Sequence, residues 1–341
     1  MFDLDKITRA NIRRLTPYSN AREEFSDSDG IFLDANENPY GTLNRYPDPY
    51  QRELKQAIST SNGLLPQNVF VANGSDEIID LMFRIFCNPT SDKALTFSPT
   101  YGMYDVAANI HDVELIKVEL NSVFDIDFKS VEDFISDPNL KLILICSPNN
   151  PTGNCLDFGT IQRILSSFNG IVMIDEAYID FSDSTSFTNL IDKYPNLVVS
   201  QTMSKAWGLA AARIGLAFTT TDIVKLLNKV KPPYNVSRLN QEAAIQSIAN
   251  KEKFLKNKQR ILKEKKLLYS SLNQLEIIKK IYPSEANFFL VETENATQVY
   301  EALVQKRIIV RNRNAIVRNC MRITVGTAQE NQFLIQTLKS I

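Results

Sequence analysis

Short apolar runs alternate with longer amphipathic stretches between about residue 69 and residue 220. Continuous apolar runs bounded by Gly, Pro, Asn or Asp are typical of strands that are buried on both faces. The stretches between them have apolar residues at helical spacing, which predicts a mostly parallel sheet wrapped by helices. The strands that we expect cover residues 93–97, 113–118, 141–146, 171–174, 197–200 and 215–219.

Residues 75–87 have the strongest helical pattern in this region. Apolar residues recur on one face, from Ile78 to Phe86. Ser75 is expected to cap the N-terminus, where Asp76 and Glu77 suit the positive end of the helix dipole. A second helix is predicted for residues 157–168.

The pattern changes after Pro232 and Pro233. Residues 240–275 predict a long helical region, broken once, and a strand (287–291), a helix (296–306) and two strands (308–311 and 321–325) follow. We therefore expect a large domain at residues 41–239 and a small α/β domain at residues 240–341. Residues 1–40 have little periodicity, and we expect them to pack on the small domain or on a partner subunit.

Composition excludes several classes of protein. The net charge is −1 and the basic residues are scattered, which argues against nucleic-acid binding. No apolar run is long enough to cross a bilayer, and the N-terminus does not resemble a signal peptide. The four cysteines have no metal-type spacing and His111 is the single histidine, so neither a metal site nor a Ser-His-Asp triad is expected. We expect a reduced, cytoplasmic setting.

One lysine follows an apolar strand and precedes an arginine by eight positions. Lys205 comes after Thr202 and Ser204, and Arg213 leads into the next strand. A lysine that forms an imine must react with the carbonyl carbon as a neutral amine, which requires desolvation or nearby cations. Arg213 and Ser204 would suit a phosphate beside that lysine. A surface loop with these residues is the alternative.

Three further strand ends have candidate side chains. Asp175 ends the apolar run at 171–174 and points to the crevice where open α/β sheets bind ligands, unless it caps a helix. Asn150 lies in a turn after residue 146. Gly74, Ser75 and Asp76 form a strand-to-helix turn, where backbone amides bind phosphate. Tyr101 opens another such turn.

The order of these motifs resembles the fold-type-I pyridoxal-phosphate (PLP) aminotransferases. Asn-Pro-Thr-Gly at 150–153, Asp-Glu-Ala-Tyr at 175–178 and Ser-Lys at 204–205, followed by Arg-Ile-Gly at 213–215, carry the resemblance. The motifs at 15–18, 33–41, 44–49, 74–77 and 321–327 are similar to those of the histidinol-phosphate aminotransferase family. The resemblance extends from about Leu15 to Thr327, while residues 312–319 differ from the usual loop of the family.

The resemblance implies an α/β fold, a mostly parallel seven-stranded sheet with flanking helices and a smaller α/β domain, and a role for each matching residue. Lys205 would be the Schiff-base lysine and proton shuttle, Asp175 would pair with the pyridine nitrogen, and Asn150 and Tyr178 would bind the ring oxygen. Tyr101 would stack on the ring. The cofactor phosphate would be held by Gly74, Ser75, Asp76, Ser204 and Arg213, and by Tyr46 of a second subunit. The substrate-binding set would be Tyr18, Asn36, Tyr234, Arg311 and Arg322.

The implied reaction is transamination in histidine biosynthesis by a homodimer, with histidinol phosphate and glutamate or 2-oxoglutarate as substrates. Both substrates are anions, and a guanidinium group accepts either one. Without the resemblance, ordinary ion pairs at a strand edge are the alternative explanation for Arg311 and Arg322. An aromatic-amino-acid aminotransferase or a threonine-phosphate decarboxylase remains an alternative, as does a non-catalytic binding protein. A nucleotide-dependent oxidoreductase is disfavoured, because the sequence has neither a Gly-rich dinucleotide fingerprint nor a P-loop.

Overall fold

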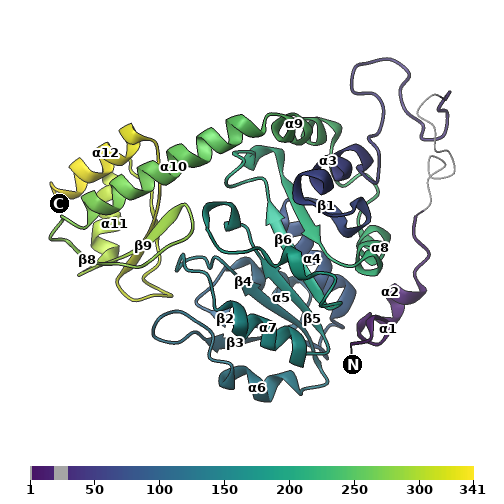
Figure 1. Ribbon diagram of the computed structural model, residues 1–341, viewed down its shortest axis with the longest axis horizontal. Helices are drawn as coiled ribbons and strands as arrows, with labels where there is room; N and C mark the ends of the chain where they lie inside the picture. Colours follow the sequence, from purple (N-terminus) through teal and green to yellow (C-terminus); the bar gives the residue numbers. More distant parts are fainter. Residues whose placement is uncertain (1, 19–29) are drawn as a thin grey trace.

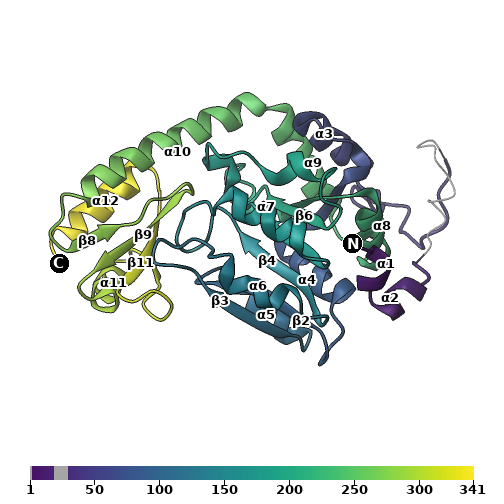
Figure 2. The same cartoon turned by 60° about the horizontal axis from the view of Figure 1, so that its bottom comes forward.

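The computed structural model describes residues 2–18 and 30–341 of the protein. Two β-sheets are connected by the long helix α10 (Lys251–Leu272), which arches from the larger sheet to the smaller one (Figures 1 and 2). One sheet has seven strands and the other has four. The domain boundaries that we expect, at residues 41–239 and 240–341, stay a prediction.

The larger sheet has seven strands. Every strand except β7 runs in the same direction, because β7 is antiparallel to its neighbours β1 and β6 while the remaining pairs are parallel. The predicted mostly parallel sheet is confirmed. In spatial order the strands are β1 (Val69–Asn73), β7 (Ile214–Phe218), β6 (Leu197–Thr202), β5 (Ile171–Asp175), β4 (Leu140–Cys146), β2 (Lys93–Ser98) and β3 (Glu114–Glu119).

Alternating side chains of this sheet supply two apolar cores. Val69 and Val71 of β1 face one core, and Phe70 and Ala72 face the other. The first core is covered by α3 (Arg52–Asn62), α6 (Lys129–Ile135), α7 (Phe158–Ser167) and α9 (Arg238–Ala249), and the second by α4 (Ser75–Phe86), α5 (Met103–Ile110) and α8 (Thr221–Val230). The described residues also include the short 3-10 turns η2 (Pro66–Asn68), η3 (Ile179–Phe181), η4 (Phe187–Leu190) and η5 (Ala210–Ala212).

Helix α4 begins at Ser75, as expected, but its N-cap residue differs from the expectation. Its N-cap is Gly74, whose φ of 80° is a conformation that favours glycine, and Ser75 is already inside the helix. None of the described side chains caps this N-terminus. The expectation that Ser75 caps the helix is therefore wrong, because the strand turns into the helix at the glycine.

The smaller sheet is antiparallel throughout. Its order is β10 (Arg311–Asn312), β11 (Cys320–Thr324), β9 (Phe288–Thr293) and β8 (Ile278–Ile281), with α11 (Ala296–Gln305) and α12 (Ala328–Leu338) packed beside it. The predicted long helical region is two helices, α9 and α10, that meet at Asn250. The strand expected at residues 308–311 is shorter and later, because only residues 311 and 312 pair with β11.

The N-terminal helices contact the core of the larger sheet. We expected residues 1–40 to pack on the small domain or on a partner subunit, and the partner contact stays a prediction. Helices α1 (Leu4–Ile7) and α2 (Ala10–Arg14) pack against the apolar core beside α4, where Ile12 is buried. The Arg9 guanidinium donates to the carbonyl oxygen of Arg84 at 2.8 Å, and Lys229 Nζ donates to that of Arg13 at 2.8 Å. Residues 30–46 extend away from the body of the molecule (Figure 1).

Two features are absent from the described part of the chain. No helix within residues 2–18 and 30–341 combines the length and apolar character needed to cross a bilayer. Within the same ranges, His, Cys, Asp and Glu side chains form no group of three or more that is placed to hold a metal ion.

Candidate active site

A cavity of about 310 Å³ lies beyond the carboxyl ends of β4, β5 and β6. This is the edge at which open α/β sheets bind ligands, because the ends of parallel strands meet there. Its lining combines residues of both sheets: Ser75, Asp76, Tyr101, Cys146, Asn150, Asp175, Ala177, Tyr178, Thr202, Ser204, Lys205, Arg213, Arg311, Arg313 and Arg322.

Lys205 is one of the residues that line this cavity. Its ammonium nitrogen is 5.6 Å from the centre of the Tyr178 ring. The residue keeps contact with solvent, but partial burial and then the charge of Arg322 lower the pKa of the Lys205 amine. Both effects favour the neutral, nucleophilic amine that imine formation needs.

Asp175 ends β5 and is only 3% exposed. Its carboxylate accepts hydrogen bonds from the Tyr104 hydroxyl at 3.1 Å and from the Ala177 amide at 3.1 Å. Burial raises the pKa of Asp175 to about 6, although both hydrogen bonds oppose the shift. A buried carboxylate that is held at a fixed position suits a protonated heterocyclic nitrogen, which would return it to the ionised form.

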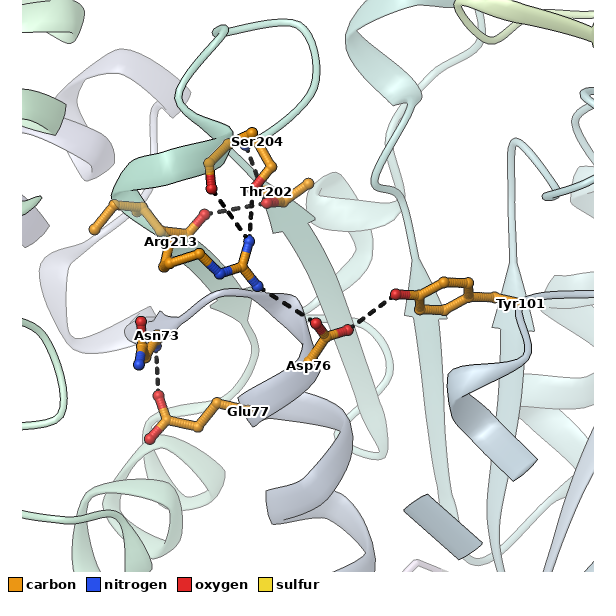
Figure 3. A network of polar contacts seen from close by, with 9 residues as sticks. Asn73, Asp76, Glu77, Tyr101, Thr202, Ser204 and Arg213 are labelled. Carbon is orange, nitrogen blue, oxygen red and sulfur yellow. Dashed lines mark hydrogen bonds and ion pairs between the residues drawn. The ribbon is translucent and has the colours of Figure 1, made fainter. Parts of the chain in front are cut away.

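A polar network surrounds one end of the cavity (Figure 3). The Arg213 guanidinium lies between Ser204 Oγ and Asp76 Oδ2, at 3.4 Å from each, and the Tyr101 hydroxyl donates to Asp76 Oδ1 at 3.1 Å. A Cβ atom on Gly74 would lie 2.3 Å from Arg213 Nη2, so only glycine lets the arginine approach the helix here. The uncapped start of α4, Ser204 and Arg213 together present the backbone amides, hydroxyl and guanidinium group that a phosphate requires.

Arginines surround the opposite end. Arg311 and Arg322 lie opposite each other in the β10–β11 pair, and Arg313 follows two residues later. Arg322 Nη1 donates to Asn150 Oδ1, which connects this end to the loop after β4. The Nε atoms of Arg313 and Arg322 are buried and have no hydrogen-bond partner in the described chain.

The structure thus brings together most of the residues predicted from the sequence. Lys205, Asp175, Tyr178, Asn150, Tyr101, Ser75, Asp76, Ser204, Arg213, Arg311 and Arg322 line the cavity, and Gly74 borders it. Four others lie outside it in this chain. The rings of Tyr46 and Tyr234 stack on each other, with 4.4 Å between their centres. Tyr18 is exposed at the edge of another pocket, and Asn36 is exposed. Their roles remain predictions.

Sequence reasoning missed two functional candidates. Tyr104 is fully buried and contacts Asp175, and it lies one helical turn after Tyr101. Arg313 lines the cavity, and its separation of two residues from Arg311 matches the alternation of a strand. Both signals were present in the sequence. They could be interpreted only once the partners across the fold were known.

A nucleophilic lysine, a buried carboxylate and a phosphate site around one cavity fit PLP, and the fold and site together define a PLP-dependent aminotransferase. The family model for class I and II aminotransferases matches residues 16–338. A histidinol-phosphate aminotransferase of Cytophaga hutchinsonii is 48% identical, over 99% of this chain and 99% of the relative. The chain therefore belongs to the class I and II aminotransferases and, within them, to the histidinol-phosphate aminotransferase family.

Solved structures agree with this fold. The histidinol-phosphate aminotransferase of Clostridium acetobutylicum superposes with a TM-score of 0.80 at 26% identity, covering 87% of this chain and 90% of the other. The enzyme of Sinorhizobium meliloti, in complex with pyridoxal-5'-phosphate, has a TM-score of 0.79 at 21% identity, covering 90% and 89% of the two chains. The second likeness supports the fold alone.

Proposed function

We propose that this protein transfers the amino group between L-histidinol phosphate and 2-oxoglutarate, giving imidazole acetol phosphate and L-glutamate in histidine biosynthesis. The observation that supports the proposal is a single cavity that is lined by the start of α4, Ser204 and Arg213 and also by three arginines, Arg311, Arg313 and Arg322. Such a cavity accepts a substrate whose anionic group lies away from its amino group. Glutamate and histidinol phosphate both have this property.

When bound, PLP supplies an aldehyde that accepts the amino group and a ring that delocalises the electrons of the broken C–H bond. With the cofactor bound, Lys205 Nζ would remove the proton from the substrate α-carbon and would deliver it to the aldehyde carbon of the cofactor. Asp175 stabilises the protonated ring nitrogen, and Asn150 and Tyr178 donate to the ring oxygen. Tyr101 stacks on the ring, and Ser75, Asp76, Ser204 and Arg213 hold the phosphate end.

At the substrate end, Arg322 and Arg311 bind the carboxylate of glutamate or the phosphate of histidinol phosphate. Tyr18, Asn36 and Tyr234 are the other members of the proposed substrate-binding set, although they lie outside the cavity of this chain. A guanidinium fork can bind either anion through two hydrogen bonds. The position of Arg322 supports this role, because its hydrogen bond to Asn150 joins the substrate end to the cofactor end.

The proposed assembly is a homodimer with shared active sites. Residues 30–46 support it, since Ile31, Leu33 and Tyr40 are 93%, 88% and 84% exposed, and apolar groups in this number on one extension favour burial against another chain. In the dimer, Tyr46 contributes to the cofactor-phosphate site of the second subunit. We also propose a cytoplasmic location, which is supported by the four free cysteines.

Three substrates distinguish this function from its neighbours. Purified holoenzyme is assayed with histidinol phosphate, phenylalanine and threonine phosphate, each with 2-oxoglutarate, and product analysis separates transamination from decarboxylation. We expect the highest kcat/KM with histidinol phosphate. A higher value with phenylalanine, or release of CO2 from threonine phosphate, would replace the proposed reaction. Borohydride reduction followed by peptide mapping should label Lys205, and a protein with no label would be a binding protein.

A further inference from the structure

The hairpin formed by β10 and β11 has three arginines on one face. Arg311 pairs with Arg322 across the strands, and the ladder continues where the Arg313 amide donates to the Cys320 carbonyl oxygen at 2.9 Å. Residues 311 and 313 lie on the same face, because side chains alternate along an extended chain. All three guanidinium groups consequently line the active-site cavity.

The backbone turn holds Arg313 at a fixed position. Its carbonyl oxygen accepts from the Ile316 amide at 2.9 Å and from the Val317 amide at 2.8 Å. Asn314 accepts from the Asn319 amide at 2.7 Å and closes the same turn. The anchor of the side chain is therefore organised before any ligand arrives, which lowers the entropy cost of binding.

The charge of this cluster is not balanced by neighbouring carboxylates. Throughout the residues that the structure describes, neither Asp nor Glu forms an ion pair with Arg311, Arg313 or Arg322, whereas Arg213 at the other end is paired with Asp76. Burial and the neighbouring charges of Arg322 and Arg311 lower the pKa of Arg313 to about 10, so it remains a cation at neutral pH. Its buried Nε–H also lacks an acceptor in the described chain. An unsatisfied buried donor is costly, and an anionic ligand would relieve that cost.

The number of guanidinium groups exceeds what a carboxylate needs. A carboxylate has one charge and two oxygens, which Arg322 and Arg311 are able to satisfy. A phosphate monoester has a charge of about −1.5 to −2 at pH 7 and three acceptor oxygens. We propose that Arg313 is a specificity-determining residue, which binds a phosphomonoester substrate and contributes little to the binding of a dicarboxylate. This inference rests on the function proposed above and assigns its phosphate selectivity to one residue.

The two half-reactions of the holoenzyme separate the two anions. Each is followed by cofactor absorbance, with L-histidinol phosphate or L-glutamate as the amino donor. Arg313→Gln should raise the apparent Kd of histidinol phosphate roughly 10- to 100-fold, the effect of losing a charge-assisted hydrogen bond, and should change that of glutamate less than about threefold. The apparent Kd of histidinol phosphate for Arg313→Lys should fall between those of the wild type and Arg313→Gln. Lysine keeps the charge but loses the two-pronged geometry of the guanidinium group.

Arg318→Gln is the matched control, since Arg318 is an exposed arginine of the same hairpin that does not line the cavity. It should leave both half-reactions unchanged. The inference would be overturned if Arg313→Gln weakened the binding of both amino donors equally, or weakened the binding of neither. Circular dichroism and cofactor absorbance of each variant show whether the protein is folded and loaded.

Inorganic phosphate distinguishes a failure of this inference from a failure of the proposed function. It is tested as a competitive inhibitor of the glutamate half-reaction, which does not depend on which phosphorylated substrate is natural. Arg313→Gln should raise the inhibition constant at least about tenfold. The wild-type enzyme could prefer phenylalanine while Arg313→Gln still raises the inhibition constant of phosphate. In that case the proposed reaction is wrong and the phosphate site stands. An unchanged inhibition constant would contradict the role of Arg313.

Discussion

The active-site cavity has guanidinium groups at both of its ends, but their surroundings differ. At the cofactor end, Arg213 contacts Asp76, which also accepts a hydrogen bond from Tyr101. At the substrate end, the described chain supplies Arg311, Arg313 and Arg322 with no paired carboxylate. A balanced site suits a cofactor that stays bound through every turnover. An unbalanced, concave cluster attracts anions from solution and suits substrates that must enter and leave.

Removal of the amine between the two ends should have the largest effect. Lys205→Ala is expected to reduce kcat by roughly 10³-fold or more, because the α-carbon proton loses its acceptor, while the phosphate end still binds cofactor. Single-turnover absorbance and borohydride labelling measure the two properties. Lys251→Ala, on the distant start of α10, is the control. Substantial turnover by Lys205→Ala would show that another base works between the two ends.

The buried carboxylate gives a prediction about stability. Folding raises the pKa of Asp175 from 3.8 to about 6, so in the cofactor-free protein the ionised group destabilises the fold above pH 6, by about 3 kcal/mol. That penalty disappears as the pH falls toward 3.8. Asp175→Asn should therefore raise the free energy of unfolding of the cofactor-free protein at pH 8, with the gain shrinking below pH 6.

Chemical denaturation at several pH values measures this difference. Asp222→Asn is the control for removal of a carboxylate, because that side chain is exposed. A gain that grows as the pH falls would contradict the assigned cause. Asp175→Asn in the cofactor-loaded enzyme should lower activity, since the cofactor ring loses its carboxylate partner.

Arg322→Ala tests whether the two ends are independent. We expect the KM values of glutamate and histidinol phosphate to rise roughly 10- to 100-fold, while the Kd of the cofactor stays the same. Steady-state kinetics and cofactor fluorescence titration measure the two quantities. Weaker binding of the cofactor would mean that the two ends are coupled. A rise in the KM of one substrate only would mean that the substrates do not share Arg322.

Gly74→Ala should affect the cofactor end alone. The added Cβ would displace Arg213 and raise the Kd of the cofactor about tenfold, with normal KM values at saturating cofactor. Gly63→Ala is a matched control, because Gly63 also has a positive φ, of 67°, but nothing within 4 Å of the added atom. It should cost about 1 kcal/mol of stability and leave the cofactor Kd unchanged.

The smallest expected effect concerns the proposed second subunit. Tyr46→Phe should raise the Kd of the cofactor roughly 3- to 10-fold, because one hydrogen bond to the phosphate is lost. Fluorescence titration at a protein concentration where sedimentation shows a dimer measures it. Tyr40→Phe, on the same exposed segment, is the control. An unchanged Kd for Tyr46→Phe would remove the cross-subunit contact from the proposal.

Most of the large sheet and its site could be predicted because the signals are local. Apolar runs identify strands buried on both faces, and the polar residues that follow them, such as Asp175, meet at one edge of the sheet. The remainder depended on contacts between distant segments. Arg313 is positioned by the pairing of β10 with β11. Tyr104 is a functional candidate because it contacts Asp175, which lies 71 residues away in the sequence. The contact of α2 with α4 could not be read from periodicity for the same reason.

Helix α10 makes the cavity sensitive to small rotations. A helix of 22 residues is about 33 Å long, so each degree of tilt at Asn250 moves its far end by about 0.6 Å. The arginines of the smaller sheet travel with that end, while Lys205 and Arg213 remain with the larger sheet. A backbone joint remote from all chemistry thereby sets the distance between the two anion sites, and hence the length of molecule that can bridge them.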